Sequence, residues 1–156
     1  MTKIERISFL IVEWGIYVAL FTPLVLIRNY FFPYVSPKTI FFRIIIDIVF
    51  IAYILLVVTN RRYLPQINAL TVSVTVFIGV LFLTSLTGIN FAKSFWSTFE
   101  RMTGLLTIFH LYAFFIVLTS AFQERKYWER ILTASILAGV AAALYAVLAN
   151  DPASRS

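Results

Sequence analysis

Ionisable side chains inside long apolar runs are the residues of this sequence that could carry out chemistry. Glu13 lies in the first run, Arg43 and Asp47 lie in the second, and His110 lies in the fourth. Charged groups are costly in an apolar environment, so they mark either a functional site or a fixed contact between helices. The sequence has no cysteine, which excludes disulfides, thiolate nucleophiles and cysteine-ligated metals.

Arg43 and Asp47 are four residues apart, which places them one turn apart on the same face of a helix. This spacing predicts an ion pair within that helix. Two roles stay open for the pair: a structural clamp, or a group that orients a lipid-linked anion. Glu13 lies about 9 Å inside the first run at a rise of about 1.5 Å per residue, where it could reach the interface or face a neighbouring helix.

Glu100 and Arg101 stand together at the start of the fourth run. A carboxylate is favourable near a helix N-terminus, so Glu100 is expected to be a capping residue. A cation is unfavourable there unless it pairs with an anion, and the planar guanidinium of Arg101 suits a phosphate or pyrophosphate. Arg101 is therefore expected to bind either a lipid phosphate or a carboxylate such as that of Glu100.

His110 is the only histidine, and its neighbours in the sequence are mainly apolar or aromatic. A hydrogen-bonded contact with another helix and a role as a general base are both open. The sequence has no second histidine, and no carboxylate stands near His110 in the sequence, so nothing indicates a metal site. The sequence also lacks a glycine-rich phosphate loop and the G-x-S-x-G, D-x-D and H-E-x-x-H patterns. We therefore assign no catalytic residue, metal or cofactor.

The composition indicates which elements must position these residues. Of 156 residues, 61% are hydrophobic and 13% are charged, and the mean hydropathy is +0.91. An ordinary soluble domain has roughly 25% charged residues, so this chain has too few polar groups to cover a soluble surface. We predict an all-α integral membrane helical bundle that forms a single domain over residues 1–156. The net charge of +6 is attributed to loops and anionic membrane lipids, and not to nucleic acid.

Five apolar runs match the roughly 20 residues that are needed to cross a hydrocarbon core. The predicted spans cover residues 7–27, 37–59, 69–86, 98–122 and 131–148. The first run follows basic residues as a signal peptide would, but it is too long and has no small-residue cleavage site. We interpret it as a retained span, with Pro23 bending its last turn.

Local signals predict where these spans begin and end. Ser36 suits a helix N-cap and Pro37 suits the first helical position, so the second span should begin there. Gly88 is expected to end the third span in a left-handed conformation. Ser97 and Glu100 form a capping-box pattern that should open the fourth span. Residues 123–130 are expected to form a charged turn.

The fifth span carries a ladder of small residues, Ala134, Ala138, Ala142 and Ala146. Such a face lets another helix approach closely, and this partner helix could lie outside the chain. The basic residues predict the orientation. Seven lie on the side of the N-terminus and five on the other side, once Arg43 is counted within its helix. Because cytoplasmic loops carry the basic excess, the N-terminus is predicted to be cytoplasmic.

Two segments carry patterns that are typical of a known family. Residues 32–43 contain F-P-x-x-x-x-K-x-x-x-F-R and are followed by Asp47, and residues 94–104 contain S-F-W-x-x-x-E-R-x-x-G and are followed by His110. Together they resemble the N-terminal part of bacterial O-antigen ligase-like membrane proteins. The resemblance covers about residues 7–148, and the second pattern is the more specific.

The resemblance implies a location and an activity. Members of this family are polytopic glycosyltransferases of the bacterial inner membrane, which transfer a polysaccharide from an undecaprenyl-pyrophosphate carrier to an acceptor such as the lipid A core. It implies a metal-independent reaction in which arginines hold the pyrophosphate and a base activates the acceptor hydroxyl. It further implies that Arg101, Lys38 and Arg43 form part of a groove for the lipid carrier.

The sequence departs from the family pattern in its length. Members have about a dozen spans, and their main catalytic arginines and histidine lie on a large periplasmic loop between late spans, which would follow residue 156. We therefore expect a truncated gene or a fragment that is incomplete for catalysis. The alternative is a small non-enzymatic membrane protein of five spans that packs against a partner. Half of a transporter is a third interpretation, although the sequence shows no pair of broken helices.

Overall fold

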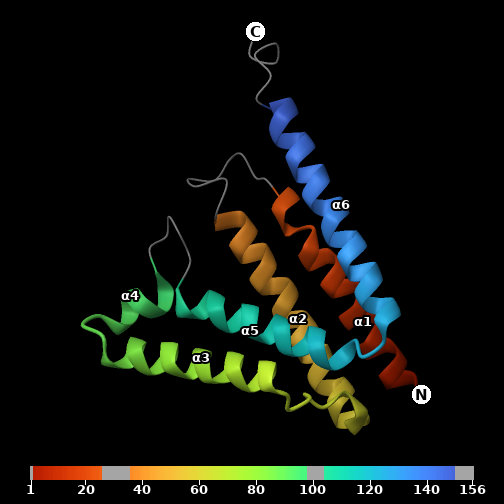
Figure 1. Cartoon of the computed structure of the whole chain (residues 1–156), viewed down its shortest axis with the longest axis horizontal. Helices are drawn as coiled ribbons and strands as arrows, with labels where there is room; N and C mark the ends of the chain where they lie inside the picture. Colours follow the sequence, from red (N-terminus) through yellow and green to blue (C-terminus); the bar gives the residue numbers. More distant parts are fainter. Residues whose placement is uncertain (1, 26–35, 98–103, 150–156) are drawn as a thin grey trace.

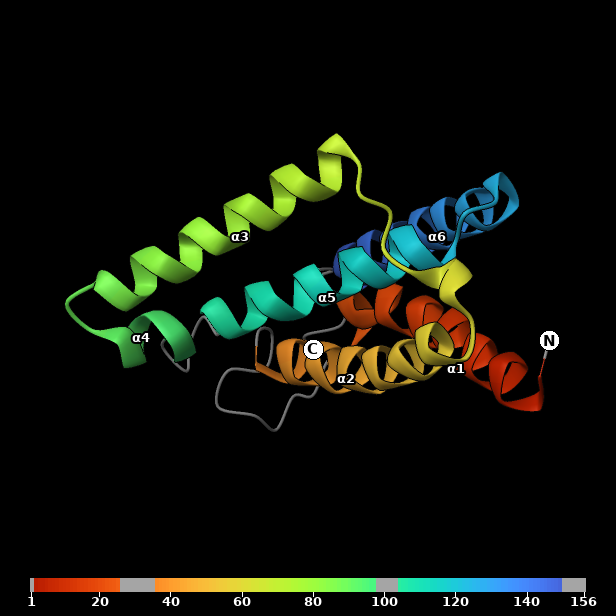
Figure 2. The ribbon, with the colours of Figure 1, turned by 90° about the horizontal axis from the view of Figure 1, so that it is seen from below.

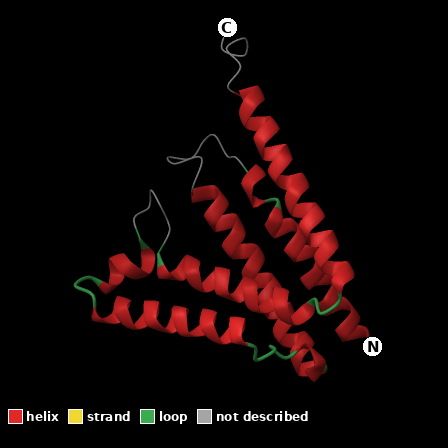
Figure 3. Cartoon of the chain, in the orientation of Figure 1, coloured by secondary structure: helices red, strands yellow, loops and turns green. Residues whose placement is uncertain are grey.

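The computed structural model describes residues 2–25, 36–97 and 104–149. In these ranges the chain folds into helices and short connections without any strand, as Figure 3 shows. The prediction of an all-α bundle is therefore confirmed. The helices, in chain order, are α1 (Lys3–Leu20), η1 (Thr22–Leu24), α2 (Ser36–Thr59), η2 (Arg61–Tyr63), α3 (Ala69–Thr87), α4 (Phe91–Trp96), α5 (Leu105–Ala121) and α6 (Arg125–Ala149).

The helices form two groups that share α5. In Figure 1, α1 lies between α2 and α6, and it contacts both. Helices α3 and α5 run side by side in opposite directions, and α4 joins them (Figures 1 and 2). Helix α5 also contacts α2 and α1, so it connects the α3–α4 hairpin to the other three helices.

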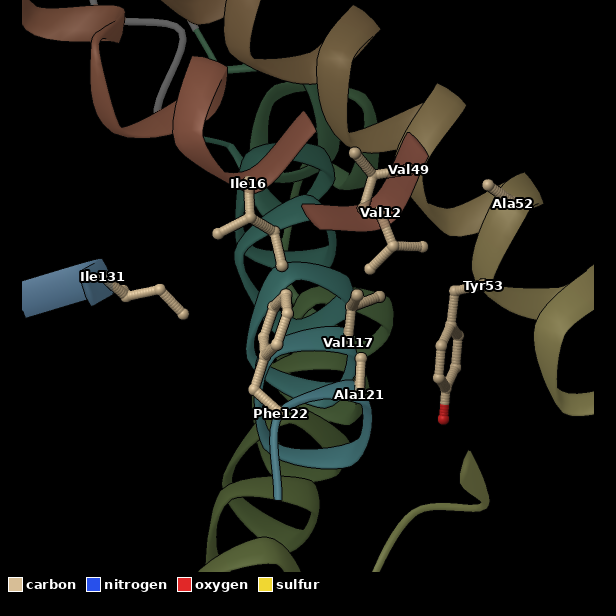
Figure 4. Close-up of a cluster of buried hydrophobic side chains, with 9 residues drawn as sticks. All are labelled: Val12, Ile16, Val49, Ala52, Tyr53, Val117, Ala121, Phe122 and Ile131. Carbon is tan, nitrogen blue, oxygen red and sulfur yellow. The ribbon is translucent and has the colours of Figure 1, made fainter. Parts of the chain in front are cut away.

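The core lies where α1, α2 and α5 meet the start of α6, and Figure 4 shows its nine buried side chains. Val12 and Ile16 are one helical turn apart, so α1 presents one apolar face to this core. In a membrane the lipid is as apolar as these side chains, so close packing stabilises the core more than removal from water does. The cluster consists of Val12, Ile16, Val49, Ala52, Tyr53, Val117, Ala121, Phe122 and Ile131.

A glycine allows α1 and α2 to approach closely. A Cβ atom built on Gly15 would collide with the side chain of Val49. Valine is branched at Cβ and has few allowed rotamers in a helix, so it cannot easily move aside. Gly15 is therefore a packing position of the α1–α2 interface.

Three helices are long and apolar enough to cross a membrane: Pro37–Thr59, Ala69–Thr87 and Arg125–Val147. Helix α5 is also apolar, but it has 17 residues. Helix α1 has 18 residues and carries four charged side chains, Lys3, Glu5, Arg6 and Glu13. These lengths and compositions indicate a membrane protein, while the number of five spans stays a prediction.

The first helix differs from its predicted bounds because of a polar cap. It begins at Lys3, where Thr2 Oγ1 accepts a hydrogen bond from the Glu5 amide and the Glu5 carboxylate accepts one from the Thr2 amide, both at 3.2 Å. This capping box satisfies amides that would otherwise have no partner. The helix ends at Leu20, and Pro23 lies in the short η1 helix that follows.

The predicted start of the fourth span is wrong. Ser97 ends α4 with a φ of 64°, and α5 begins at Leu105 with Gly104 as its N-cap. A Cβ atom at Gly104 would collide with the backbone of Phe95 and Trp96, so the end of α4 packs directly against the start of α5. This contact between helices sets the start of α5. Glu100, which was expected to cap it, lies outside the described residues.

Two further boundaries differ from the expectation. Gly88 follows α3 in an extended conformation, with φ −70° and ψ 157°, and not in a left-handed one. Helix α6 begins at Arg125, so most of the predicted charged turn is helical. Arg125 and Glu129 form an ion pair of 2.9 Å at a spacing of four residues, which stabilises the first turns of this helix.

Candidate functional site

Four polar side chains meet where α2 crosses α5, and we name them the α2–α5 cluster. Arg43 Nη2 donates a hydrogen bond of 2.6 Å to Thr107 Oγ1, and Asp47 Oδ1 lies 3.2 Å from His110 Nε2. The two α2 residues are four positions apart and the two α5 residues are three apart, so each helix presents both of its members on one face. The cluster therefore links the two groups of helices.

These contacts correct the prediction of an ion pair within α2. The spacing places Arg43 and Asp47 on one face as expected, but the contacts that they make run to α5. Helix α5 carries the Thr107 hydroxyl opposite Arg43 and the His110 imidazole opposite Asp47, so each charged group has a separate polar partner. The short contacts of the two side chains run to α5, and the charge of Asp47 also acts on Arg43 along α2.

Asp47 lies near the middle of the most hydrophobic of the three candidate spans. It is the twelfth of the 24 residues of α2, about 17 Å from either end at a rise of about 1.5 Å per residue. Its side chain is 65% exposed, whereas that of His110 is 14% exposed. Ionisable groups at this depth are costly and pair with other polar groups. Asp47 Oδ1 contacts His110, and the rest of the carboxylate is exposed at the surface of the bundle.

Both ring nitrogens of His110 face oxygen atoms. Nε2 faces Asp47 Oδ1, and Nδ1 lies 2.7 Å from the carbonyl oxygen of Leu106. A neutral imidazole has one N–H donor, so it can donate to one of these oxygens only. The Asp47–His110 contact places an acidic and a basic side chain together between α2 and α5.

The other predicted site residues are spread over the molecule. Lys38 is half-buried in the first turn of α2, five residues before Arg43 and about 7.5 Å away along the axis. Glu13 of α1 faces Arg130 of α6, with Oε1 and Nη1 4.0 Å apart. This is the neighbouring helix that the sequence left open for Glu13. Arg101 lies outside the described residues, as does Glu100.

The small-residue ladder of α6 meets part of its own chain. Ala138 is 2% exposed, and α6 contacts both η1 and α1. Small side chains allow this close approach, as the pattern predicts. Ala138 is therefore covered by its own chain, whereas the sequence alone also allowed a partner helix outside the chain. An external partner helix for Ala134 and Ala142 stays a prediction.

A second group of polar contacts joins the start of α1 to two connections between helices. The Glu5 carboxylate accepts a hydrogen bond of 2.9 Å from Asn60, and Gln123 donates one of 3.0 Å to the Arg62 carbonyl oxygen. The Tyr53 hydroxyl donates to the Tyr63 carbonyl oxygen at 3.0 Å. We name this region, formed by the start of α1, η2, the α5–α6 connection and the first turns of α6, the basic end.

The basic end gathers positive charge. Its elements carry the seven basic residues that the sequence places on the side of the N-terminus, namely Lys3, Arg6, Arg61, Arg62, Arg125, Lys126 and Arg130. Burial raises the pKa of the Tyr63 phenol, and the negative charge of Glu5 raises it further. A small cavity of about 60 Å³ lies between Phe9, Tyr63 and Tyr127.

The sequence indicated the charged site residues Arg43 and Glu13 but not the residues that contact them. Thr107 and Arg130 were not singled out, although the first binds Arg43 and the second faces Glu13. Thr107 could have been noticed because it stands three residues before His110 in an apolar run. Nothing in the sequence indicates that Arg130 approaches Glu13, because that depends on how α6 packs on α1.

The cluster has the groups for charge pairing and hydrogen bonding between helices. Within the described ranges, no three histidine, aspartate or glutamate side chains are close enough to hold a metal ion. Comparison of the chain with known protein families, with curated proteins and with solved structures found no match.

Proposed function

We propose that this chain is the N-terminal membrane portion of an O-antigen ligase-like glycosyltransferase of the bacterial inner membrane. In this proposal it forms scaffold and part of the groove for an undecaprenyl-pyrophosphate-linked polysaccharide, and a further part of the enzyme completes catalysis. One observation carries the proposal. The first of the two segments that resemble this family contains Arg43 of the α2–α5 cluster, and the second directly precedes α5, which supplies the other half of the cluster.

The first segment contacts the helix that follows the second segment. The first segment supplies Arg43 directly and is followed by Asp47, whereas the second ends at Gly104, one residue before α5 begins. Arg43 binds Thr107, 64 residues further along the chain. Residues that build a common site must lie close together in the fold, and Arg43 of the first segment contacts α5, the helix that follows the second segment. This contact supports the proposal, since Arg43 and Thr107 are far apart in the sequence.

The chemistry of the cations fits a pyrophosphate carrier. Arginine presents a planar fork of donors that matches phosphate oxygens, and cations stabilise the charge on a departing pyrophosphate. We assign this role to Arg43, Lys38 and Arg101. Asp47 and His110 hold α2 against α5 and so position Arg43. A base for the acceptor hydroxyl is assigned to the missing part of the enzyme.

The proposal is tested by complementation in a strain that lacks its own ligase. A protein that extends beyond residue 156 should restore polymer attachment, whereas residues 1–156 alone should give none. Arg101→Lys should lower attachment about 10-fold, because loss of one charge-assisted hydrogen bond is worth at least about 1.4 kcal/mol. Arg125→Lys is the matched control, since Arg125 lies exposed at the basic end.

Two results would contradict the proposal. Ligation by residues 1–156 alone would show that no further catalytic part is needed. Full attachment in both Arg101→Ala and Arg43→Ala would remove these arginines from the carrier site.

A second candidate function has one observation in its favour. Among the helices that the structure describes, α3 contacts only α4 and α5 closely, and most of its apolar side chains are exposed. A small non-enzymatic membrane protein could pack against a partner through this face. The chain has no cysteine, so a cysteine introduced at Phe77 is unique and can be cross-linked. Cross-linking to a separate protein favours this function, whereas cross-linking within an extended chain favours the ligase-like one.

A further inference from the structure

An open groove lies between α1 and the first half of α6. Tyr17 of α1 lines one side, and Lys126, Arg130 and Leu137 of α6 lie along the other. Ala134, which has a small side chain, is also in the lining. Figure 1 shows these two helices side by side, with the start of α6 at the same end of the molecule as the N-terminus.

The charged groups divide unevenly along the groove. Glu129 also lines the groove, but its carboxylate is paired with Arg125 at 2.9 Å. Arg130 is 53% exposed, and Glu13 approaches it only at 4.0 Å. Lys126 and Arg130 are four residues apart, so both cations lie on one face of α6. This end of the groove therefore presents two cations to a ligand.

The opposite end of the groove is apolar and extends along the membrane. Beyond Arg130 the lining consists of Thr133, Ala134 and Leu137, and the Thr133 hydroxyl is bonded to the Glu129 carbonyl oxygen at 2.8 Å. From Arg130 to Leu137 the helix rises about 10 Å, which is about two thirds of one leaflet of a 30 Å hydrocarbon core. The groove thus has a cationic end at the interface and an apolar part that extends into one leaflet.

We infer that this groove binds one anionic phospholipid. The phosphate lies between Lys126 and Arg130, and one acyl chain runs along Ala134 and Leu137 against Tyr17. The two cations of the groove, Lys126 and Arg130, favour an anionic headgroup over a zwitterionic one. The site is separate from the α2–α5 cluster, so it does not depend on the proposed function.

Native mass spectrometry of the detergent-purified protein tests this inference, with phosphatidylglycerol and phosphatidylcholine as probes. We expect one phosphatidylglycerol molecule to bind in preference to phosphatidylcholine. Lys126→Gln with Arg130→Gln should weaken phosphatidylglycerol binding about 30-fold. Each basic residue near the surface contributes about 1 kcal/mol to the binding of an anionic lipid, and two such losses correspond to this factor. Arg61→Gln with Arg62→Gln removes the same charge from the basic end outside the groove and should leave this binding within about twofold.

A second variant tests the shape of the groove without changing its charge. Ala134→Leu should fill the apolar end and weaken phosphatidylglycerol binding, while Ala143→Leu, on an exposed part of the same helix, should not. Equal binding of the two lipids, equal losses in the two charge variants, or unchanged binding in both Lys126→Gln with Arg130→Gln and Ala134→Leu would overturn the inference. Circular dichroism confirms that each variant is folded.

Discussion

At the scale of single residues, the main feature is a carboxylate and an imidazole that meet in the middle of apolar helices. Asp47 and His110 lie 3.2 Å apart, and the second ring nitrogen of His110 faces a backbone carbonyl oxygen. Loss of either partner leaves the other with an unsatisfied polar group in an apolar environment. The two residues should therefore be energetically coupled, although Asp47 and Arg43 share a helix face.

A double-mutant cycle distinguishes the two possible pairs. We expect Asp47→Ala and His110→Ala to show a coupling of about 0.6 kcal/mol, the average for hydrogen bonds between membrane helices. Arg43→Ala and Asp47→Ala should be closer to additive, because their contacts run to different residues of α5. The free energy of unfolding in mixed detergent micelles measures both cycles. A larger coupling for Arg43 with Asp47 would restore the pair within α2.

Tyr63 gives a pH dependence at the basic end. Burial raises the pKa of its phenol in the folded protein above the ordinary value of about 10. The contribution of this group to stability is therefore complete below about pH 10 and is lost as the pH rises through the raised folded-state pKa. Tyr63→Phe should lose less stability than the parent protein on alkaline titration. Identical losses in the two proteins would assign the alkaline transition to another group.

At the scale of helices, the α1–α2 interface depends on Gly15. Gly15→Ala should destabilise the protein by about 1–3 kcal/mol, because the added methyl group collides with Val49 and overpacks the interface. Gly139→Ala is the matched control. A Cβ atom there meets nothing within 4 Å, so this change should stabilise α6 by about 0.5–1 kcal/mol.

Thermal unfolding in detergent measures these glycine variants. Combining Gly15→Ala with Val49→Ala should recover part of the lost stability, since the smaller side chain makes room for the new methyl group. Equal effects of Gly15→Ala and Gly139→Ala would mean that close approach is not the function of Gly15.

The sequence predicted helices better than it predicted contacts. The second span was predicted over residues 37–59 and α2 covers Ser36–Thr59, because Ser36, Pro37 and the polar residues after Thr59 are strong local signals. The start of α5 was misplaced, since a capping-box pattern is local whereas the contact of Gly104 with the end of α4 is not. Spacing likewise showed that Arg43 and Asp47 share a face, but only packing determines which helix that face meets.

At the scale of the whole molecule, the basic end predicts the orientation. Seven basic residues lie on elements that meet at this end, so it should be cytoplasmic. Alkaline phosphatase fused after Lys93 should be active and a fusion after Arg62 should be inactive, because α3 separates the two positions. The reverse pattern would overturn the orientation, and equal activity would mean that α3 does not cross the membrane.

The length of α5 has a consequence for the lipid around it. Its 17 residues span about 26 Å, which is about 4 Å less than a typical hydrocarbon core. A bilayer adapts to such a hydrophobic mismatch by thinning locally. Headgroups and water around α5 would then lie deeper than elsewhere, closer to Arg43 and Asp47, which reduces the cost of keeping these charges in an apolar helix.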